Sequence, residues 1–265
     1  MKRSRACFDL VQITDSHLYG DGERGLYGLN SYRALSEVVA LAARRQPAFA
    51  LLSGDLVHDE TRQGYELLKR AIAPLGCPAH AIPGNHDDLK LMCQVLDCGK
   101  TIRHGGWQII LLNSQVAGEV GGCLGQGELE FLEQALTQFP EYASLICMHH
   151  QPLPIGSQWL DRIGLKNGEA LFDIVDRHSQ VKALVWGHVH QAFDGQRNGV
   201  RLLATPSTCI QFKPGADDFA LDDLAPGYRW FRLFEDGEME TGIERLPQMP
   251  GAIDRDASGY DEDNG

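Results

Sequence analysis

The sequence predicts an α/β fold, with one domain over residues 1–247, and two observations support this prediction. First, short apolar runs with the length of buried strands alternate with longer segments whose apolar residues recur at helical spacing. Second, the alternation ends in two strand-like runs that flank Asp236 and Gly237, a dipeptide typical of β-hairpin turns. Such alternation is typical of sheets that are covered by helices and buried on both faces.

Each element follows from its local pattern. The first strand is predicted at 8–14, and the next segment, 31–45, has apolar residues on one helical face after a possible cap at Asn30 or Ser31. The other predicted helices cover residues 64–75, 89–97, 127–139 and 169–178. The other predicted strands cover residues 48–53, 79–83, 107–114, 144–149, 181–187, 201–207, 228–235 and 238–246.

Composition limits the classes of function. Of 265 residues, 43% are hydrophobic and 23% are charged, as in ordinary globular proteins with a sizeable core. The formal net charge of −12 argues against binding of nucleic acid polymers, which relies on Lys and Arg at phosphates. No apolar run approaches the roughly 18 residues of a membrane span. We therefore expect no nucleic acid partner and no membrane partner.

The cysteines and the C-terminal residues give two further expectations. Seven scattered cysteines without a C-x-x-C pair predict reduced thiols, and the N-terminal apolar segment is too short for a signal peptide, so a cytoplasmic location is expected. Residues 248–265 are rich in acidic side chains and are predicted to form a disordered tail. The sequence carries no signal for the oligomeric state.

Polar side chains follow five of the predicted strands directly. In α/β folds the carboxyl ends of strands are where ligand sites gather, so we expect these side chains to meet. Two of the clusters are pairs separated by one residue, Asp15 with His17 and His188 with His190, and extended residues two apart point to the same side. The full set of candidates is Asp15, His17, Asp55, Asn85, His86, His149, His150, His188 and His190.

The residue types indicate a metal centre. Carboxylate, amide and imidazole ligands without a thiolate suit Mn, Fe, Zn or Mg better than a structural zinc site. The candidate ligands exceed the needs of one ion, and an aspartate can bridge two ions that lie roughly 3.5–4 Å apart. The sequence therefore predicts a dinuclear site with Asp15, His17, Asp55, Asn85, His149, His188 and His190 as ligands.

The stretch after residue 82 combines four polar side chains with separate predicted roles. Asn85 offers a neutral ligand oxygen, and His86 points into the site without binding metal. Asp87 is expected to hold the His86 imidazole from behind, as carboxylates often do. Asp88 is expected to begin the next helix, where a negative charge is favourable.

Several positions have two readings. His150 competes with His149 for the ligand role, and His149 is favoured because it is closer to the strand end. His58 and Asp59 either support the site or start a helix. A third set either lines the pocket or has only a strand and turn role: Thr208, Gln211 and Lys213.

These clusters together resemble the calcineurin-like metallophosphoesterase superfamily. Its blocks occur here in order as "TDSH", "SGDLVHD", "PGNHD", "MHHQP" and "WGHVH". From about Phe8 to Leu246 the chain is more specifically similar to bacterial class III 3′,5′-cyclic AMP phosphodiesterases. The stretches "HHQPLPIGSQWLD" and "RLLATPSTCIQFKPG" carry this closer resemblance. The resemblance implies a four-layer αββα sandwich, in which two mixed β-sheets are flanked by helices.

The resemblance also implies roles for individual residues. One metal is expected on Asp15, His17, Asp55 and His190, and the other on Asp55, Asn85, His149 and His188, with Asp55 shared. The ions would come from Fe, Mn, Mg, Zn or Co. His86 is expected to contact phosphate and to protonate the leaving oxygen, with Asp87 as its catalytic partner. The residues expected against the substrate are His17, Asn85, His86, His149 and His190.

The function implied is hydrolysis of 3′,5′-cyclic AMP to 5′-AMP through attack by metal-bound hydroxide, so the expected partner is a small cyclic nucleotide. A phosphodiesterase or phosphomonoesterase of broader specificity is the alternative. A metal-poor scaffold of the same fold is a third reading, against which the intact ligand set argues.

Overall fold

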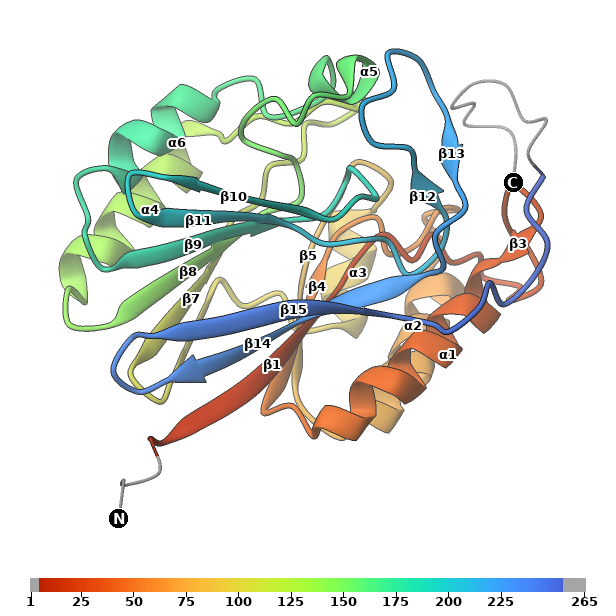
Figure 1. Cartoon of the computed structure of the whole chain (residues 1–265), viewed down its shortest axis with the longest axis horizontal. Coiled ribbons are helices and arrows are strands. Elements are labelled where there is room, and N and C mark those ends of the chain that lie inside the picture. Colours follow the sequence, from red (N-terminus) through yellow and green to blue (C-terminus); the bar gives the residue numbers. More distant parts are fainter. Residues whose placement is uncertain (1–4, 255–265) are drawn as a thin grey trace.

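The computed structural model describes residues 5–254, in which two mixed sheets form the centre of the molecule (Figure 1). The first sheet has the order β15 (Met239–Arg245), β14 (Gly227–Phe234), β1 (Cys7–Ile13), β4 (Phe49–Ser53) and β5 (Ala79–Ile82). The second sheet has the order β10 (Phe193–Arg197), β11 (Val200–Ala204), β9 (Val181–Trp186), β8 (Ala143–Cys147), β7 (Trp107–Leu111) and β6 (Thr101–His104). In the first sheet β1, β4 and β5 are parallel neighbours, while β14 pairs antiparallel with both β1 and β15. In the second sheet the middle strands are parallel and the edge strands β6 and β10 run antiparallel to their neighbours.

Helices cover the outer face of each sheet (Figure 1). The first sheet packs against α1 (Ser31–Ala42), α2 (Arg62–Ile72) and α3 (Leu89–Val95). The second packs against α4 (Gln126–Gln138) and α6 (Gly168–Val175). The smaller elements are η1 (Ala43–Arg45), η2 (Ala73–Leu75), α5 (Gln158–Asp161), the pair β2 (Gly25–Leu26) and β3 (Leu29–Asn30), and the pair β12 (Gln211–Phe212) and β13 (Leu221–Asp222).

Three apolar cores separate the four layers. Leu10 of β1 and Leu51 of β4 face Trp107 and Ile109 of β7 in the core between the sheets. Val11, the next residue on β1, belongs instead to the core beneath α1 and α2, as the two-residue period of a strand requires. Each fully buried side chain of this size contributes roughly 1.5–3 kcal/mol. The predicted αββα sandwich is confirmed.

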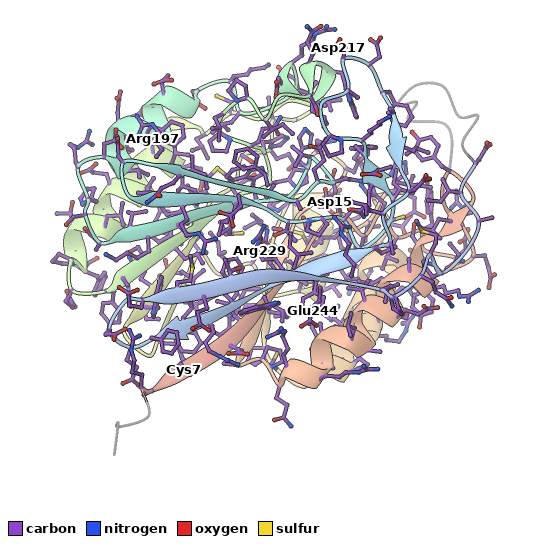
Figure 2. All side chains as sticks on the ribbon, viewed as in Figure 1. Cys7, Asp15, Arg197, Asp217, Arg229 and Glu244 are labelled. Carbon is purple, nitrogen blue, oxygen red and sulfur yellow. A yellow bond between two sulfur atoms is a disulfide. The ribbon has the colours of Figure 1, made fainter. Side chains whose placement is uncertain are left out.

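A buried arginine also joins the two sheets. Arg229 on β14 is 2% exposed and lies in the space between the sheets (Figure 2). Its Nη2 donates hydrogen bonds to the carbonyl oxygens of Phe193 (3.1 Å) and Ala204 (2.8 Å), at the end of the second sheet formed by β10 and β11. Burial lowers the pKa of Arg229 to about 10. These bonds tie β14 of the first sheet to the end of the second sheet.

Within the two main sheets, the sequence pattern missed β6 and β10, which are the two edges of the second sheet. Edge strands are short and partly exposed, so they lack the apolar run that marks a buried strand. The hairpin between β14 and β15 turns at Asp236 and Gly237 as predicted, and Gly237 adopts a φ of 85°.

The prediction that all cysteines are reduced is wrong for one pair. A disulfide joins Cys93 and Cys98. The helix α3 that carries Cys93 ends at Val95, so the chain leaves the helix and brings Cys98 to a Cα separation of 5.5 Å. The cytoplasmic location remains a prediction.

The start of the predicted tail packs against the domain. Met249 and Ile253 contact the core beneath the second sheet, and the backbone N–H of Asp254 donates to the carbonyl oxygen of Tyr27 at 2.7 Å. Disorder is therefore wrong for these residues. Positions 255–265 lie outside the described residues, so the domain boundary remains a prediction. Between residues 5 and 254, no helix has the length and apolar character needed to cross a bilayer.

Candidate active site

The polar residues that follow the strands meet at one end of the sandwich. The Asp55 carboxylate lies between the two sheets: its Oδ2 is 3.3 Å from Nε2 of His149 and 3.8 Å from Nε2 of His17. His190 brings its Nε2 to 3.4 Å from Oδ1 of Asp15 and 3.2 Å from Nε2 of His17. Loops that follow β1, β4, β8 and β9 thus supply one cluster, as the sequence predicts.

The cluster divides into overlapping groups that share residues. Potential ligand atoms lie within 4.8 Å of one another in three buried groups: Asp15, His17 and His190; Asp15, Asp55 and His149; and His149, His150 and His188. Buried carboxylates surrounded by imidazoles are a donor set suited to divalent transition metals.

The backbone conformation of these residues differs from the extended one that the sequence predicts. Five residues of the cluster adopt the left-handed conformation, with positive φ at Asp15 (54°), His17 (44°), Asp55 (50°), His188 (65°) and His190 (47°). The prediction that the paired residues converge because they are extended is wrong. They converge because both residues of each pair adopt the left-handed conformation beyond the strand end. Such conformations in residues other than glycine are uncommon and cluster at functional sites.

Two glycines let the loops approach closely. A Cβ on Gly54 would lie 2.4 Å from Nδ1 of His149, and a Cβ on Gly84 would lie 2.1 Å from Oδ1 of Asp55. Neither distance is compatible with a side chain. These glycines therefore allow His149 and Asp55 to pack against the neighbouring loop backbone.

Hydrogen bonds orient the histidine rings toward the cluster. Nδ1 of His149 donates to the carbonyl oxygen of Ser53 (2.8 Å), and Nδ1 of His190 donates to that of Ile210 (2.9 Å). A neutral imidazole that donates from Nδ1 presents a lone pair at Nε2. Burial lowers the pKa of His17 and His188, which keeps these rings neutral. Burial also lowers the pKa of His149, but Asp55 and Asp15 outweigh it and raise the value to about 9, so Nε2 of this ring carries a proton beside Asp55 until a cation replaces that proton.

Unsatisfied atoms test whether the site fits metal ions. Nε2 of His188 and Oδ1 of Asn85 are buried without a hydrogen-bond partner among the described residues, and Nε2 of His149 is buried 3.3 Å from the Asp55 carboxylate. Leaving such an atom unpaired costs about 1–3 kcal/mol. A cation would satisfy all three as ligands, so the donor set fits the predicted metal centre.

His150 does not share this orientation. Its Nδ1 lies 2.8 Å from Oγ of Ser114, and its Nε2 lies 3.0 Å from the carbonyl oxygen of Val120. Burial and the neighbouring His149 lower the pKa of His150 to about 3. Since both ring nitrogens of His150 have protein partners, the geometry favours His149 as the ligand, in agreement with the sequence argument.

The predicted role of Asp87 behind the His86 ring stays a prediction. Its carboxylate accepts hydrogen bonds from the backbone N–H groups of Leu56 (3.1 Å) and Gly84 (2.9 Å) and from the Tyr65 hydroxyl (3.0 Å). Burial and the charge of Asp55 raise the pKa of Asp87 to about 7, while its backbone hydrogen bonds lower it. Asp87 ties the loop after β4 to the loop after β5.

The helix prediction for Asp88 is confirmed. Asp88 caps α3, and its Oδ1 accepts a hydrogen bond from the Leu91 backbone N–H at 2.8 Å. The loop that carries Asn85 and His86 is therefore anchored on one side by Asp87 and on the other by the start of α3.

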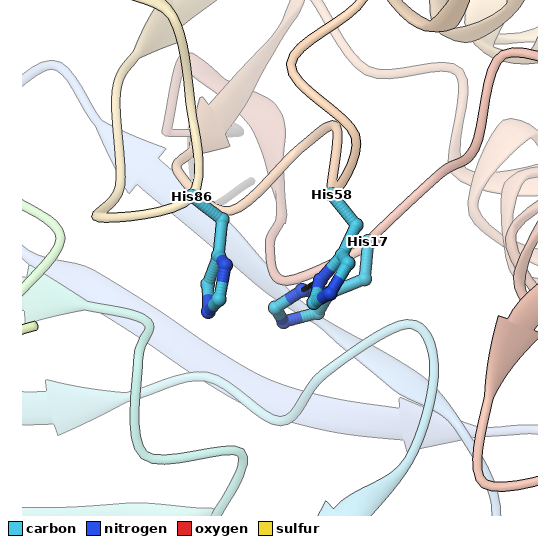
Figure 3. A group of neighbouring side chains, drawn as sticks. All are labelled: His17, His58 and His86. Carbon is cyan, nitrogen blue, oxygen red and sulfur yellow. Dashed lines mark hydrogen bonds between the residues drawn. The ribbon is translucent and has the colours of Figure 1, made fainter. Parts of the chain in front are cut away.

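His86 lies at the wall of a cavity of about 530 Å³. Its backbone N–H donates to Oδ1 of Asp55 at 3.0 Å, and its ring packs near His17 and His58 (Figure 3). Of the predicted substrate contacts, Asn85 and His86 line the cavity. The other three, His17, His149 and His190, are at most 1% exposed and lie in the buried cluster.

Sequence reasoning missed part of the cavity wall. Tyr19 and Arg24 line it together with Glu119, and no motif marks these positions. His58 and Asp59 also belong to the wall, and Asp59 accepts hydrogen bonds from the Gly20 N–H and the Thr61 hydroxyl. Of the set with two readings, Thr208 and Gln211 bond backbone carbonyls and Lys213 is exposed, which supports their strand and turn role.

Comparisons with known proteins agree with this geometry. A family model described as calcineurin-like phosphoesterase matches residues 8–192. A protein named 3′,5′-cyclic adenosine monophosphate phosphodiesterase CpdA from Pseudomonas aeruginosa is 42% identical over 95% of this chain and 94% of its own length. The protein of the same name from Vibrio vulnificus is 40% identical over the same shares.

A solved structure shows the same fold. A dimetal phosphatase from Danio rerio aligns with a TM-score of 0.63 at 16% identity and covers 88% of this chain and 98% of its own. The family model spans more than half of the chain, and it includes Asp15, His17, Asp55, Asn85, His149, His188 and His190. The chain therefore belongs to the calcineurin-like phosphoesterase family.

Proposed function

We propose that the chain is a dinuclear-metal phosphodiesterase that hydrolyses 3′,5′-cyclic AMP to 5′-AMP. The observation that carries the proposal is the position of Asp55 between His17 and His149, where one carboxylate faces two sets of ligand atoms. The relatives named as cyclic AMP phosphodiesterases, which match over nearly the whole chain, support the choice of substrate.

The ligand sets follow the two sides of Asp55. Asp15, His17, Asp55 and His190 would hold one ion, and Asp55, Asn85, His149 and His188 the other. Fe, Mn, Mg, Zn or Co would suit these donors. When bound, the two ions supply Lewis-acid activation of water and of the phosphate oxygens.

The side chain of His86 would act on the substrate. It lies at the cavity wall, and its backbone is held by Asp55, so its ring is placed beside the ligand cluster without belonging to the proposed sets. There the imidazole would hydrogen-bond the phosphate and protonate the 3′ oxygen as the ester bond breaks. General acid catalysis of this kind contributes about 10²- to 10⁴-fold.

A product assay tests the substrate. The protein is loaded with Mn²⁺, its metal content is measured, and products are identified from 3′,5′-cyclic AMP, 3′,5′-cyclic GMP, 2′,3′-cyclic AMP and bis(p-nitrophenyl) phosphate. We expect 5′-AMP from cyclic AMP, with a kcat/KM above that of the nitrophenyl diester. Equal values would leave a broad phosphodiesterase, and no hydrolysis of any ester would leave a scaffold.

Substitution of His86 tests its role. We expect His86→Ala to lower turnover of cyclic AMP by about 10²-fold or more, with the metal content unchanged. His104→Gln, a change at an exposed histidine of β6, is the matched control. Parallel loss of metal and turnover would place His86 among the ligands.

A further inference from the structure

We propose that His58 is a positioning residue that holds two rings of the site at once, the proposed acid His86 and the proposed ligand His17. The inference rests on the proposed function and adds a residue to it. His58 lies on the loop after β4, between the Asp55 loop and the start of α2, and it lines the cavity beside His86 (Figure 3).

The first contact of His58 orients His17. Nδ1 of His58 lies 3.2 Å from Nδ1 of His17, while Nε2 of His17 faces the buried cluster near Asp55 and His190. A neutral His17 that offers a lone pair from Nε2 carries its proton on Nδ1 and donates it to Nδ1 of His58. His58 thus performs for His17 what the Ser53 carbonyl performs for His149.

The second contact supports His86. The rings of His58 and His86 are stacked, with centroids 4.6 Å apart and planes 22° from parallel. The edge of the His86 ring also approaches His17, at a centroid distance of 5.2 Å. Two neighbouring rings at different angles therefore limit the rotation of the His86 imidazole.

The stacked geometry also argues against a metal site formed by His17, His58 and His86. Ring nitrogens of His17, His58 and His86 lie within 4.8 Å of one another, close enough to suggest a third metal site. However, the lone pairs of imidazole nitrogens lie in the ring plane, and those of two nearly parallel stacked rings do not converge on one ion. The geometry of His58 and His86 suits packing better than coordination.

The loops hold His58 firmly in this position. Its backbone N–H donates to the carbonyl oxygen of Leu18 at 2.8 Å, within a short parallel pairing of the loops after β1 and β4. The Tyr19 ring lies 5.0 Å from the His58 ring, and the Arg24 guanidinium lies 4.4 Å from the Tyr19 ring. A row of neighbouring groups thus runs from Arg24 at the surface, through Tyr19 and His58, to His86 in the cavity.

The contacts with His58 and His17 hold the His86 ring in one orientation. A catalytic group held by packing stays close to its productive geometry, and loss of its support costs rate even when the group itself is present. We expect loss of the stack on His86 to lower kcat for cyclic AMP by about 10-fold when the metal sites are filled.

Two substitutions separate the two contacts. His58→Gln keeps a group that can hydrogen-bond Nδ1 of His17 but removes the stack, so we expect metal content to be retained and kcat to fall by about 10-fold. His58→Phe keeps the stack but removes the hydrogen bond, so we expect weaker metal binding and, at saturating Mn²⁺, a kcat within about 3-fold of the parent. His104→Gln is the matched histidine control.

A double-mutant cycle shows whether His58 acts through His86. In a His86→Ala background, His58→Gln should have no further effect on kcat, because the group it positions is absent. The loss from His58→Gln should also be larger for cyclic AMP than for bis(p-nitrophenyl) phosphate, whose leaving group needs no proton. An equal loss in both backgrounds, or on both substrates, would overturn the proposal.

A readout independent of activity completes the test. In Zn²⁺-loaded protein, the His86 Cε1–Hε1 NMR signal should shift and broaden in His58→Gln but stay close to its parent position in His58→Phe. An unchanged signal in His58→Gln would overturn the positioning role even in a protein with no activity. Failure of the parent to hydrolyse any ester would instead count against the proposed function.

Discussion

The two sheets contribute different chemistry to the candidate site. Among the proposed ligands, those on loops of the first sheet are Asp15, Asp55, Asn85 and one imidazole, His17. Those on loops of the second sheet are all imidazoles: His149, His188 and His190. Neither sheet alone presents a complete ligand set. The site exists because the core between the sheets holds the two sets of loops face to face.

The two sets of loops also differ in how they are fixed. Loops of the first sheet are bonded to each other, through Asp87 and through the backbone N–H of His86 on Asp55. Loops of the second sheet are bonded across to the first: Nδ1 of His149 donates to Ser53, and the His188 N–H donates to Oδ1 of Asp15 at 3.0 Å. Loops of the first sheet therefore supply the hydrogen-bond acceptors that hold His149 and His188 in place.

The largest expected effect comes from Asp55, the residue proposed to be shared. Asp55→Asn removes the charge that faces both ligand sets, so we expect both ions to be lost and turnover to fall by on the order of 10³-fold or more. Metal analysis and cyclic AMP turnover on the same sample measure this. Retention of both ions would show that metal binding does not depend on the charge of Asp55.

A smaller loss is expected for a ligand from the second sheet. His188→Ala leaves the set of Asp15, His17, Asp55 and His190 complete, so we expect one ion to be lost and turnover to fall by about 10²-fold. Because binding follows mass action, added Mn²⁺ should restore part of the activity. Loss of both ions would contradict the division of the site between two ligand sets.

The internal bonds of the first sheet can be tested through stability. Asp87→Asn places an amide against backbone donors that Asp87 now satisfies, so we expect the free energy of unfolding to fall by about 2–3 kcal/mol. Tyr65→Phe removes a single hydrogen bond from the same carboxylate and should cost about 1 kcal/mol. Urea unfolding of metal-free protein measures both. Lower turnover without lower stability would instead support the predicted catalytic role of Asp87.

The sequence predicted the residues of the site better than the contacts that hold these residues in place. Strand ends followed by Asp, Asn and His predict which residues meet, because strand ends in α/β folds lie at one edge. The left-handed turns at Asp15 and His188 depend on contacts between loops and leave no local signal beyond their polar residues. The sequence left the role of His58 open for a similar reason, because its stack with His86 joins loops that are far apart in the chain.

The same limit applies to the fold. The central strands were predicted because they are buried on both faces, and the edge strands β6 and β10 were missed because they are not. The disulfide between Cys93 and Cys98 was missed because it depends on where a short helix ends, and helix ends are the least predictable part of an element.

The smallest expected effect concerns a carboxylate of the first sheet that lies away from the site. Glu244 on β15 pairs with Arg45 and accepts a hydrogen bond from the Tyr228 hydroxyl at 2.6 Å. Burial raises the pKa of Glu244, but these two partners outweigh it and hold the pKa below its ordinary value of 4.5. Glu244 is thus paired with a guanidinium, whereas Asp55 faces imidazoles.

The sign of the pH dependence follows from that lowered pKa. The stabilising contribution of Glu244 is present above pH 4.5, where the carboxylate is ionised in both states, and is lost as the pH falls through the lower folded-state value. Glu244→Gln should therefore cost less than about 1 kcal/mol at pH 7, since the pair is partly exposed, and the cost should shrink as the pH falls below 4.5. Urea unfolding across this range measures the difference. A constant difference would mean that packing rather than charge holds Glu244, and a change in metal content would contradict the separation of this carboxylate from the acids of the site.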